Sequence, residues 1–147
     1  MKKTEEPIEK VILFQLDKTS KIAKQYSQKE FDRLGLGITV DQWVLLKIIE
    51  ESAPLSQKEL AKHSTRDPAS ITRTLDLLEK KQLIERESIK GNRRQYNIIL
   101  TKQGNSFVQT NLALVSEHRR KSVEGLSKED LEQLKRMLLK IQQNMES

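Results

Sequence analysis

Two segments between residues 55 and 102 carry the residue types that contact nucleic acid. The first, residues 67–73, reads DPASITR and places short polar side chains and a guanidinium at the start of a capped helix. The second, residues 91–95, reads GNRRQ and places two arginines at a turn. A guanidinium can bind guanine O6 and N7 in the major groove, and the negative potential of the minor groove attracts it. The two segments could therefore contact neighbouring grooves of one duplex.

Helix-capping signals begin the elements that would hold these segments. A Thr or Ser stands three positions before a Gln or Glu in Thr39–Gln42 and in Ser56–Glu59. In this spacing the hydroxyl accepts from the amide three residues on, and the longer side chain reaches back to the cap. The two signals predict a mostly buried helix that ends near Ser52 and a short helix through about His63.

A third helix is predicted to begin after Asp67. Its carboxylate can accept hydrogen bonds from the free first-turn amides, and Pro68 needs no amide partner at the first helical position. At about 100° per residue, the apolar side chains of this helix fall within one narrow arc and should face the core. That arc contains Ile71, Leu75 and Leu78, and the opposite side carries Ala69, Ser70, Arg73 and Asp76.

A basic hairpin is predicted to follow the third helix. Residues 83–86 (LIER) and 96–101 (YNIILT) have strand character, and Gly91 and Asn92 between them supply turn chemistry. A tight helix pair presents its second helix to the major groove, and a basic hairpin beside it can reach the minor groove. The order of elements is that of a winged helix-turn-helix, with a two-stranded wing.

Charge is concentrated in the same part of the chain. The 147 residues carry a net charge of +6, and the stretch from Ser52 to Gln103 holds eleven Lys and Arg against six acids. Such a surplus suits a polyanion, because neutralised phosphates release counterions. A solvated basic face is the alternative that charge alone leaves open.

The two ends of the chain are predicted to be helical and poorly buried within one subunit. One long helix is expected over residues 8–34, and two more over about 105–122 and 127–145, the last beginning at a capping pattern of Ser127 and Asp130. In the last helix, apolar residues repeat at spacings of 3, 4, 3 and 4, which is a coiled-coil-like seam. With 35% hydrophobic and 4% aromatic residues, the chain is poor in core material, which favours a core shared between subunits.

Several function classes lack the residues they need. There is no cysteine, so thiolate metal sites, cysteine nucleophiles and thiol-based oxidant sensing are excluded. His63 and His118 do not share a helix face, are expected at the surface or its boundary, and predict no metal site. We find no catalytic constellation, no phosphate loop and no cofactor signal. No apolar run reaches membrane-spanning length and no signal peptide pattern is present, so we expect a single cytosolic domain with no membrane contact.

The sequence resembles the MarR family of bacterial transcriptional regulators over almost its whole length. The most specific stretch runs from Leu60-Ala61 through Ser70–Arg73, Leu83–Arg86 and Arg93-Arg94 to Leu100-Thr101 and Gly104. The resemblance implies a mainly α fold with a small β-wing, formed by a winged helix-turn-helix head at 39–102 and dimerisation helices at 8–34 and 105–146. It also implies a homodimer that binds a pseudo-palindromic operator, usually as a repressor relieved by small ligands.

The resemblance and the residue chemistry together assign candidate roles. DNA contacts are expected from the recognition helix and the wing, a ligand cleft near Trp43, and a dimer interface from both chain ends. Family wings commonly carry an aspartate where this chain has Asn92, so a carboxylate that would orient a nearby arginine is missing. The recognition-helix residues are Ala69, Ser70, Thr72 and Arg73, the wing residues are Lys90, Arg93 and Arg94, and the dimer residues are Ile8, Val11, Ile12, Leu131, Leu134, Leu138 and Ile141.

Each role has a plainer alternative. Arg73 could form a surface ion pair with Asp76 or Asp67, and Trp43 could simply be core. Of Lys90 and Arg86, one is expected to touch phosphate and the other to brace the wing against an acid such as Asp76. The sequence predicts a ligand-responsive DNA-binding regulator, with double-stranded DNA and an apolar or aromatic anionic effector as partners. A protein-interaction module with the same head is the alternative function, and a small basic enzyme is a more distant one.

Overall fold

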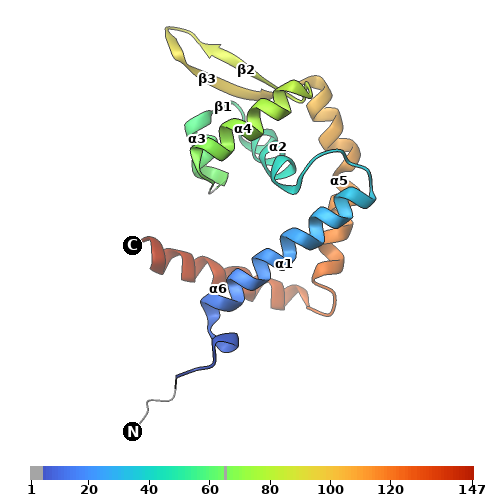
Figure 1. Ribbon diagram of the computed structural model, residues 1–147, viewed down its shortest axis with the longest axis vertical. Coiled ribbons are helices and arrows are strands. Elements are labelled where there is room, and N and C mark those ends of the chain that lie inside the picture. Colours follow the sequence, from blue (N-terminus) through green and yellow to red (C-terminus); the bar gives the residue numbers. More distant parts are fainter. Residues whose placement is uncertain (1–4, 65) are drawn as a thin grey trace. The chain divides into compact units, whose positions relative to one another are not determined.

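Over residues 5–64 and 66–147, which the computed structural model describes, the chain forms helices and one small antiparallel sheet (Figure 1). It divides into two compact units, residues 1–112 and 113–147, and the division falls within helix α5. The mainly α fold class with a β-wing is confirmed. The elements are a 3-10 turn at Ile8–Lys10, α1 Ile12–Arg33, α2 Val40–Ser52, β1 Leu55–Ser56, α3 Gln57–Ser64, α4 Pro68–Lys80, β2 Ile84–Ile89, β3 Asn92–Leu100, α5 Lys102–Ser122 and α6 Lys128–Glu146.

The predicted helix starts of the head are confirmed by the hydrogen bonds at each cap. Thr39 Oγ1 accepts from the Gln42 amide at 3.1 Å, and Gln42 Oε1 accepts from the Thr39 amide at 3.0 Å. Ser56 Oγ accepts from the Glu59 amide at 3.1 Å. Asp67 Oδ1 accepts from the Ser70 amide at 2.9 Å, with Pro68 in the first turn. These bonds satisfy amides that a helix start leaves without a partner.

The core of the first unit centres on Trp43, which is 1% exposed. Its ring meets Phe31 of α1 edge-on, with centroids 6.3 Å apart and planes at 85°, and it meets Phe107 of α5 at 6.4 Å. Aromatic pairs favour such edge-to-face geometry over stacking. The fully buried aliphatic side chains around this cluster come from α2, α3, α4 and the sheet, and include Leu45, Leu46, Ile49, Leu60, Ile71, Leu75, Leu78, Ile84 and Ile98.

The predicted two-stranded wing is present as the β2–β3 hairpin, and a short third strand, β1, extends the sheet to the order β1-β3-β2. β1 contains only Leu55 and Ser56, which pair with Ile98 and Asn97 of β3. A strand of two residues has no alternating pattern, so periodicity could not reveal it. β1 joins the root of the hairpin to the start of α3, and Leu55 is buried there.

The first helix is shorter than predicted. A 3-10 turn covers Ile8–Lys10, Val11 is extended, and α1 begins only at Ile12. Pro7 precedes the turn, and its carbonyl accepts from the Lys10 amide at 2.8 Å. The apolar spacing across Val11 fits both forms, so it could not separate a short turn from a continuous helix.

Helix α5 begins at Lys102, three residues earlier than predicted, and Gly104 lies inside it. Thr101 Oγ1 accepts from the Gly104 amide at 2.9 Å and caps the helix. A Cβ on Gly104 would lie 1.9 Å from the Leu83 carbonyl oxygen, so only glycine allows this approach. Gly104 is therefore required by packing.

The second unit contains the rest of α5 and helix α6. Ser127 and Asp130 form the predicted capping box of α6, with bonds of 3.0 and 2.9 Å. His118 of α5 is buried, contrary to the expectation of a surface position, because it lies one turn after the buried Val115 and its Nδ1 is 2.6 Å from the Val115 carbonyl oxygen. Within the described part of the chain, no helix has the length and apolar character needed to cross a membrane.

Candidate nucleic-acid interface

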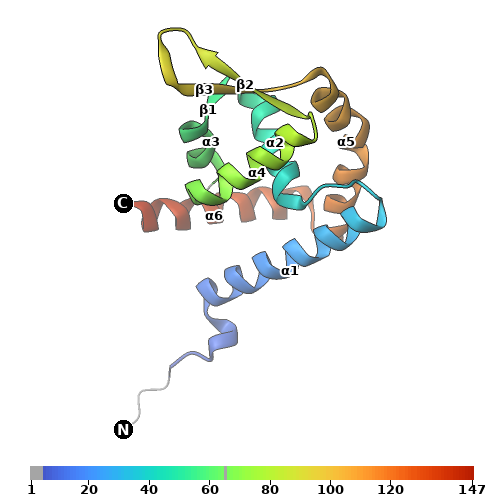
Figure 2. The same cartoon turned by 45° about the horizontal axis from the view of Figure 1, so that its top comes forward.

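The exposed side of α4 carries the four residues predicted for the recognition helix. Ala69, Thr72 and Arg73 are exposed and Ser70 is half-buried, while Ile71, Thr74, Leu75 and Leu78 are buried on the other side. The helix therefore turns the predicted side outward. In Figures 1 and 2, α4 begins beside α3 and runs toward the root of the β2–β3 hairpin.

A chain of polar contacts fixes the first turn of α4. Arg66 Nη2 donates to Ser70 Oγ at 2.5 Å and lies 3.3 Å from Asp41 Oδ2 of α2. The same Asp41 oxygen lies 3.0 Å from Lys24 Nζ of α1. Ser70 accepts from Arg66 and still has its own hydroxyl hydrogen to donate. The start of α4 is thus tied to both α1 and α2.

Thr72 is held by a second pair of hydrogen bonds. Its hydroxyl donates to the Pro68 carbonyl oxygen at 3.0 Å and accepts from Gln57 Nε2 of α3 at 2.6 Å. Gln57 is half-buried at the first position of α3. These bonds join the two helices on the side of α4 that faces outward.

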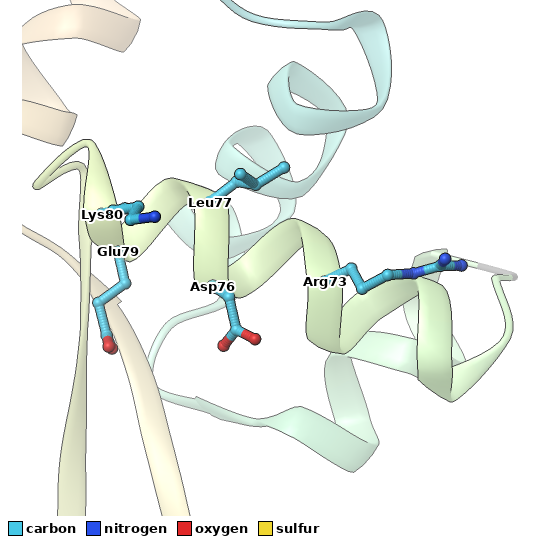
Figure 3. A pocket seen from close by; sticks show the side chains of 5 residues that line it. All are labelled: Arg73, Asp76, Leu77, Glu79 and Lys80. Atoms are coloured by element: carbon cyan, nitrogen blue, oxygen red, sulfur yellow. The ribbon is translucent and has the colours of Figure 1, made fainter.

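Arg73 forms no ion pair with any residue in the described ranges 5–64 and 66–147. The acids that could have paired with it are engaged elsewhere, because Asp67 caps α4 and Asp76 lies 2.9 Å from Arg86. Arg73 therefore does not form the surface ion pair with Asp76 or Asp67 that the sequence left open. The Arg73 guanidinium extends from α4 toward solvent (Figure 3).

Arg73 also borders a hollow on the surface of α4. The hollow has a volume of about 620 Å³ and is lined by Arg73, Asp76, Leu77, Glu79 and Lys80. Figure 3 shows Asp76 and Glu79 on one side of the helix and Leu77 on another. Leu77 is 49% exposed, so the outer face of α4 is not purely polar.

The wing turns at Lys90 and Gly91, between the paired residues Ile89 and Asn92. Gly91 has a φ of 85°, a left-handed conformation that glycine adopts without strain. Lys90 is exposed, whereas the side chains of Asn92, Arg93 and Arg94 lie outside the described ones. Pairing shifts between Ser88 and Ile89, so the arginine-bearing part of β3 is out of regular register with β2.

Arg86 braces the root of the wing against α4. Its Nη2 lies 2.9 Å from Asp76 Oδ1, and its Nη1 lies 3.4 Å from Glu79 Oε1. The Arg86 side chain is 21% exposed, so these contacts are partly shielded from solvent. Of the two basic residues whose roles the sequence left open, Arg86 is the brace and Lys90 stays free of described ion pairs.

The remaining predicted site residues belong to elements other than α4. Trp43 is a core residue, and its Nε1 has no hydrogen-bond partner among the described atoms. Ile8 and Ile12 near the start of α1 are 62% and 61% exposed. In α6 no residue is buried; Leu134 is 44% exposed, and Leu131, Leu138 and Ile141 are partly exposed.

Sequence reasoning missed Gln57, Arg66 and Glu79. Gln57 lies inside the capping pattern of Ser56 and Glu59, and that pattern assigns no role to the residue between them. Arg66 precedes the cap of α4 and was counted only as charge. Their partners are 15 and 25 residues away in the chain, at Thr72 and Asp41, and a single sequence gives no signal for such pairs. Across residues 5–64 and 66–147, no three His, Asp or Glu side chains gather in a way that could hold a metal ion.

A short helix, a second helix with an exposed polar face, and a hairpin beside it define a winged helix-turn-helix protein of the DNA-binding class. The sequence model of the MarR family matches residues 38–96. The head of this chain thus matches the MarR family, whose members are transcriptional regulators and not enzymes.

Solved structures agree with this assignment. The chain is 26% identical to S. aureus MepR, solved as a DNA complex, with a TM-score of 0.80 over 91% of this chain and 98% of that one. It is 20% identical to a MarR/EmrR family regulator from Acinetobacter sp. ADP1, with a TM-score of 0.87 over 96% and 99%. It is 22% identical to CouR from Rhodococcus jostii RHA1, solved with p-coumaroyl-CoA, with a TM-score of 0.80 over 93% and 95%.

Replacing Arg86 with alanine should loosen the wing without unfolding the head. The partners of Arg86 are themselves about half exposed, so we expect a loss of about 1 kcal/mol in unfolding free energy, measured in denaturant. Amide hydrogen exchange in β2 and β3 should become faster. As a control, Arg120→Ala removes an exposed pair with Glu117 on α5 and should leave both readouts unchanged. Unaltered exchange in the Arg86 variant would show that the brace does not hold the wing.

Proposed function

We propose that this regulator is a repressor that binds a pseudo-palindromic operator as a homodimer in the cytoplasm and releases it when a small effector binds. The observation that carries the DNA-binding part is the outward face of α4, where Arg73 is exposed and has no described ionic partner. A wing with a basic turn lies beside this face. MepR, 26% identical over nearly its whole length, was solved bound to DNA, which supports DNA binding by this chain.

The two basic elements are proposed to do different work. Arg73 lies on a helix of the kind that enters the major groove, where a guanidinium discriminates between base pairs. Arg94, with Arg93 and Lys90, lies at the wing, where the potential of the minor groove attracts cations whatever the sequence. Ala69 and Ser70 are proposed to contact DNA beside Arg73.

The alanine variants of Arg73 and Arg94 should therefore fail in different ways. Arg73→Ala should weaken operator binding by about 1–3 kcal/mol and relax the preference at particular base pairs. Arg94→Ala should weaken binding to many duplexes and reduce the slope of log affinity against log salt by about one. Titrations of matched and mismatched duplexes across a salt series measure both effects.

Arg136→Ala provides the control, because it removes the same charge from α6 and should change neither specificity nor, to a comparable degree, affinity. Identical behaviour of the Arg73 and Arg94 variants would refute the division of roles. Wild-type protein that binds no duplex from a random pool would refute the proposed function itself.

Homodimer formation is proposed from apolar surface that the single chain leaves uncovered. In α6 the apolar residues Leu131, Leu134, Leu138 and Ile141 repeat at coiled-coil spacing, yet none is buried. Ile8, Val11 and Ile12 near the start of α1 are likewise exposed or only partly covered. A second copy of the chain would bury both surfaces. Two heads about 34–36 Å apart could then enter successive major grooves.

Replacing Leu134 and Leu138 together with aspartate should abolish the dimer, because it places unpaired charge in the proposed seam at a cost of several kcal/mol. Sedimentation should show a monomer or aggregate, and operator affinity should fall. The pair Gln133→Asp and Gln143→Asp adds the same charge to positions outside the seam and should leave a dimer. A soluble dimer with normal operator affinity in the Leu134 and Leu138 variant would rule out this interface.

The effector is proposed to be an apolar or aromatic anion that enters a cleft bordered by the helix carrying Trp43. CouR was solved with p-coumaroyl-CoA, an aromatic anion, which supports this ligand class. The effector must bind more tightly to the arrangement of the two heads that cannot bind DNA than to the one that can. The difference in binding free energy equals the free energy that the effector removes from operator binding. Trp43 contacts Phe31 of α1 and Phe107 of α5, so small movements of either helix would change its surroundings.

Compounds that release the operator should change the fluorescence emission of Trp43 with matching apparent affinity. Trp43 is the single tryptophan, so the signal reports one site. Related compounds that do not release DNA serve as controls and should leave the emission unchanged. Releasing compounds that do not alter the emission would place the effector site away from Trp43 and leave this residue a core residue alone.

A further inference from the structure

The hydroxyl of Thr72 has no hydrogen left for DNA. It donates its one hydrogen to the Pro68 carbonyl oxygen at 3.0 Å, and one of its lone pairs accepts from Gln57 Nε2 at 2.6 Å. A hydroxyl has one donor and two acceptor positions. To donate to a base or a phosphate, Thr72 would have to give up a bond that it already makes.

The part of the Thr72 side chain that these bonds leave unused is chiefly its methyl group. Thr72 is exposed, as is Ala69, which lies three residues earlier on the same side of α4. Arg73 follows directly and is also exposed. The outward side of the first turns of α4 therefore presents small apolar groups next to a guanidinium, a combination suited to base edges rather than to phosphate.

Gln57 provides one of the two hydrogen bonds that restrict the Thr72 side chain. Threonine has three staggered χ1 rotamers, and the two hydrogen bonds together favour one of them. Gln57 is half-buried, so its amide is more restricted than that of a surface glutamine. A methyl group held in one position loses little rotational freedom on binding.

We propose that Thr72 recognises the 5-methyl group of thymine in the major groove, and that Gln57 is a positioning residue that holds Thr72 for this contact. Thymine is the DNA base with a methyl group on its major-groove edge, and threonine methyl groups are suited to contact it. The inference rests on the proposed binding of duplex DNA by α4. It adds a base preference and assigns a role to a residue of α3.

Replacement of thymine by uracil removes only this methyl group and tests the contact directly. Duplexes are first selected from a random pool by the wild-type protein, and each thymine of the selected site is then replaced singly by uracil. Loss of one buried methyl group should weaken wild-type binding about fourfold at one position of each half-site. Other positions should show little change.

Two variants assign the effect to the two side chains. Thr72→Ser keeps the hydroxyl and removes the methyl group, so the ratio of thymine to uracil affinity at the sensitive position should fall to about one. Gln57→Ala should also bring this ratio close to one, even if its overall affinity changes. A merely structural role of Gln57 would lower affinity for both duplexes equally. Gln95→Ala, a change at an exposed glutamine of the wing, should preserve the ratio, and thermal unfolding checks that each variant is folded.

A fourfold ratio that persists in Thr72→Ser or in Gln57→Ala would overturn the proposal, as would a wild-type protein that binds selected duplexes without any uracil penalty. In these cases the proposed DNA binding would still stand. If the wild-type protein selected no duplex, the proposed function would fail, and this inference with it.

Discussion

The burial of one side of α4 is the constraint on which its outward polar face depends. Ile71, Leu75 and Leu78 are fully buried in the core of the first unit, so the helix cannot rotate without exposing them. Exposing even one such side chain costs about 1.5–3 kcal/mol, a large part of the stability of a small domain. The packing of apolar residues thus decides which polar residues face outward. The identity of the exposed residues on α4 is therefore a consequence of how its apolar residues pack.

Polar contacts orient the exposed side chains of α4, whose outward position is already set by the core. Arg66 and Gln57 reach α4 from its N-terminal side, and Arg86 reaches it from the wing. None of these contacts is fully buried, so each contributes modestly to stability. Their effect is geometric, since they orient the exposed side chains of α4 and hold the wing beside it. The core therefore supplies stability, and the surface contacts supply orientation.

The elements that the sequence could predict are those encoded by neighbouring residues. Capping boxes placed the starts of α2 and α6, and a 3.6-residue pattern placed the buried side of α4. The contacts that escaped prediction join distant segments, as Gln57 does with Thr72, or depend on backbone proximity, as β1 does beside β3. Local propensity contains no information on such pairs. For the candidate site, sequence could therefore name the exposed residues of α4 but not the state of their hydrogen bonds.

The close approach at Gly104 has a mechanical consequence. The Leu83 carbonyl oxygen, just before β2, accepts from the Thr101 amide at 3.1 Å and leaves no room for a side chain on Gly104. The root of the hairpin and the first turn of α5 therefore meet backbone to backbone, with no flexible side chain between them to absorb a displacement. If this part of α5 tilted, the backbone contact at Gly104 would displace the root of the wing with it. Motion of the first turn of α5 would then move the wing directly.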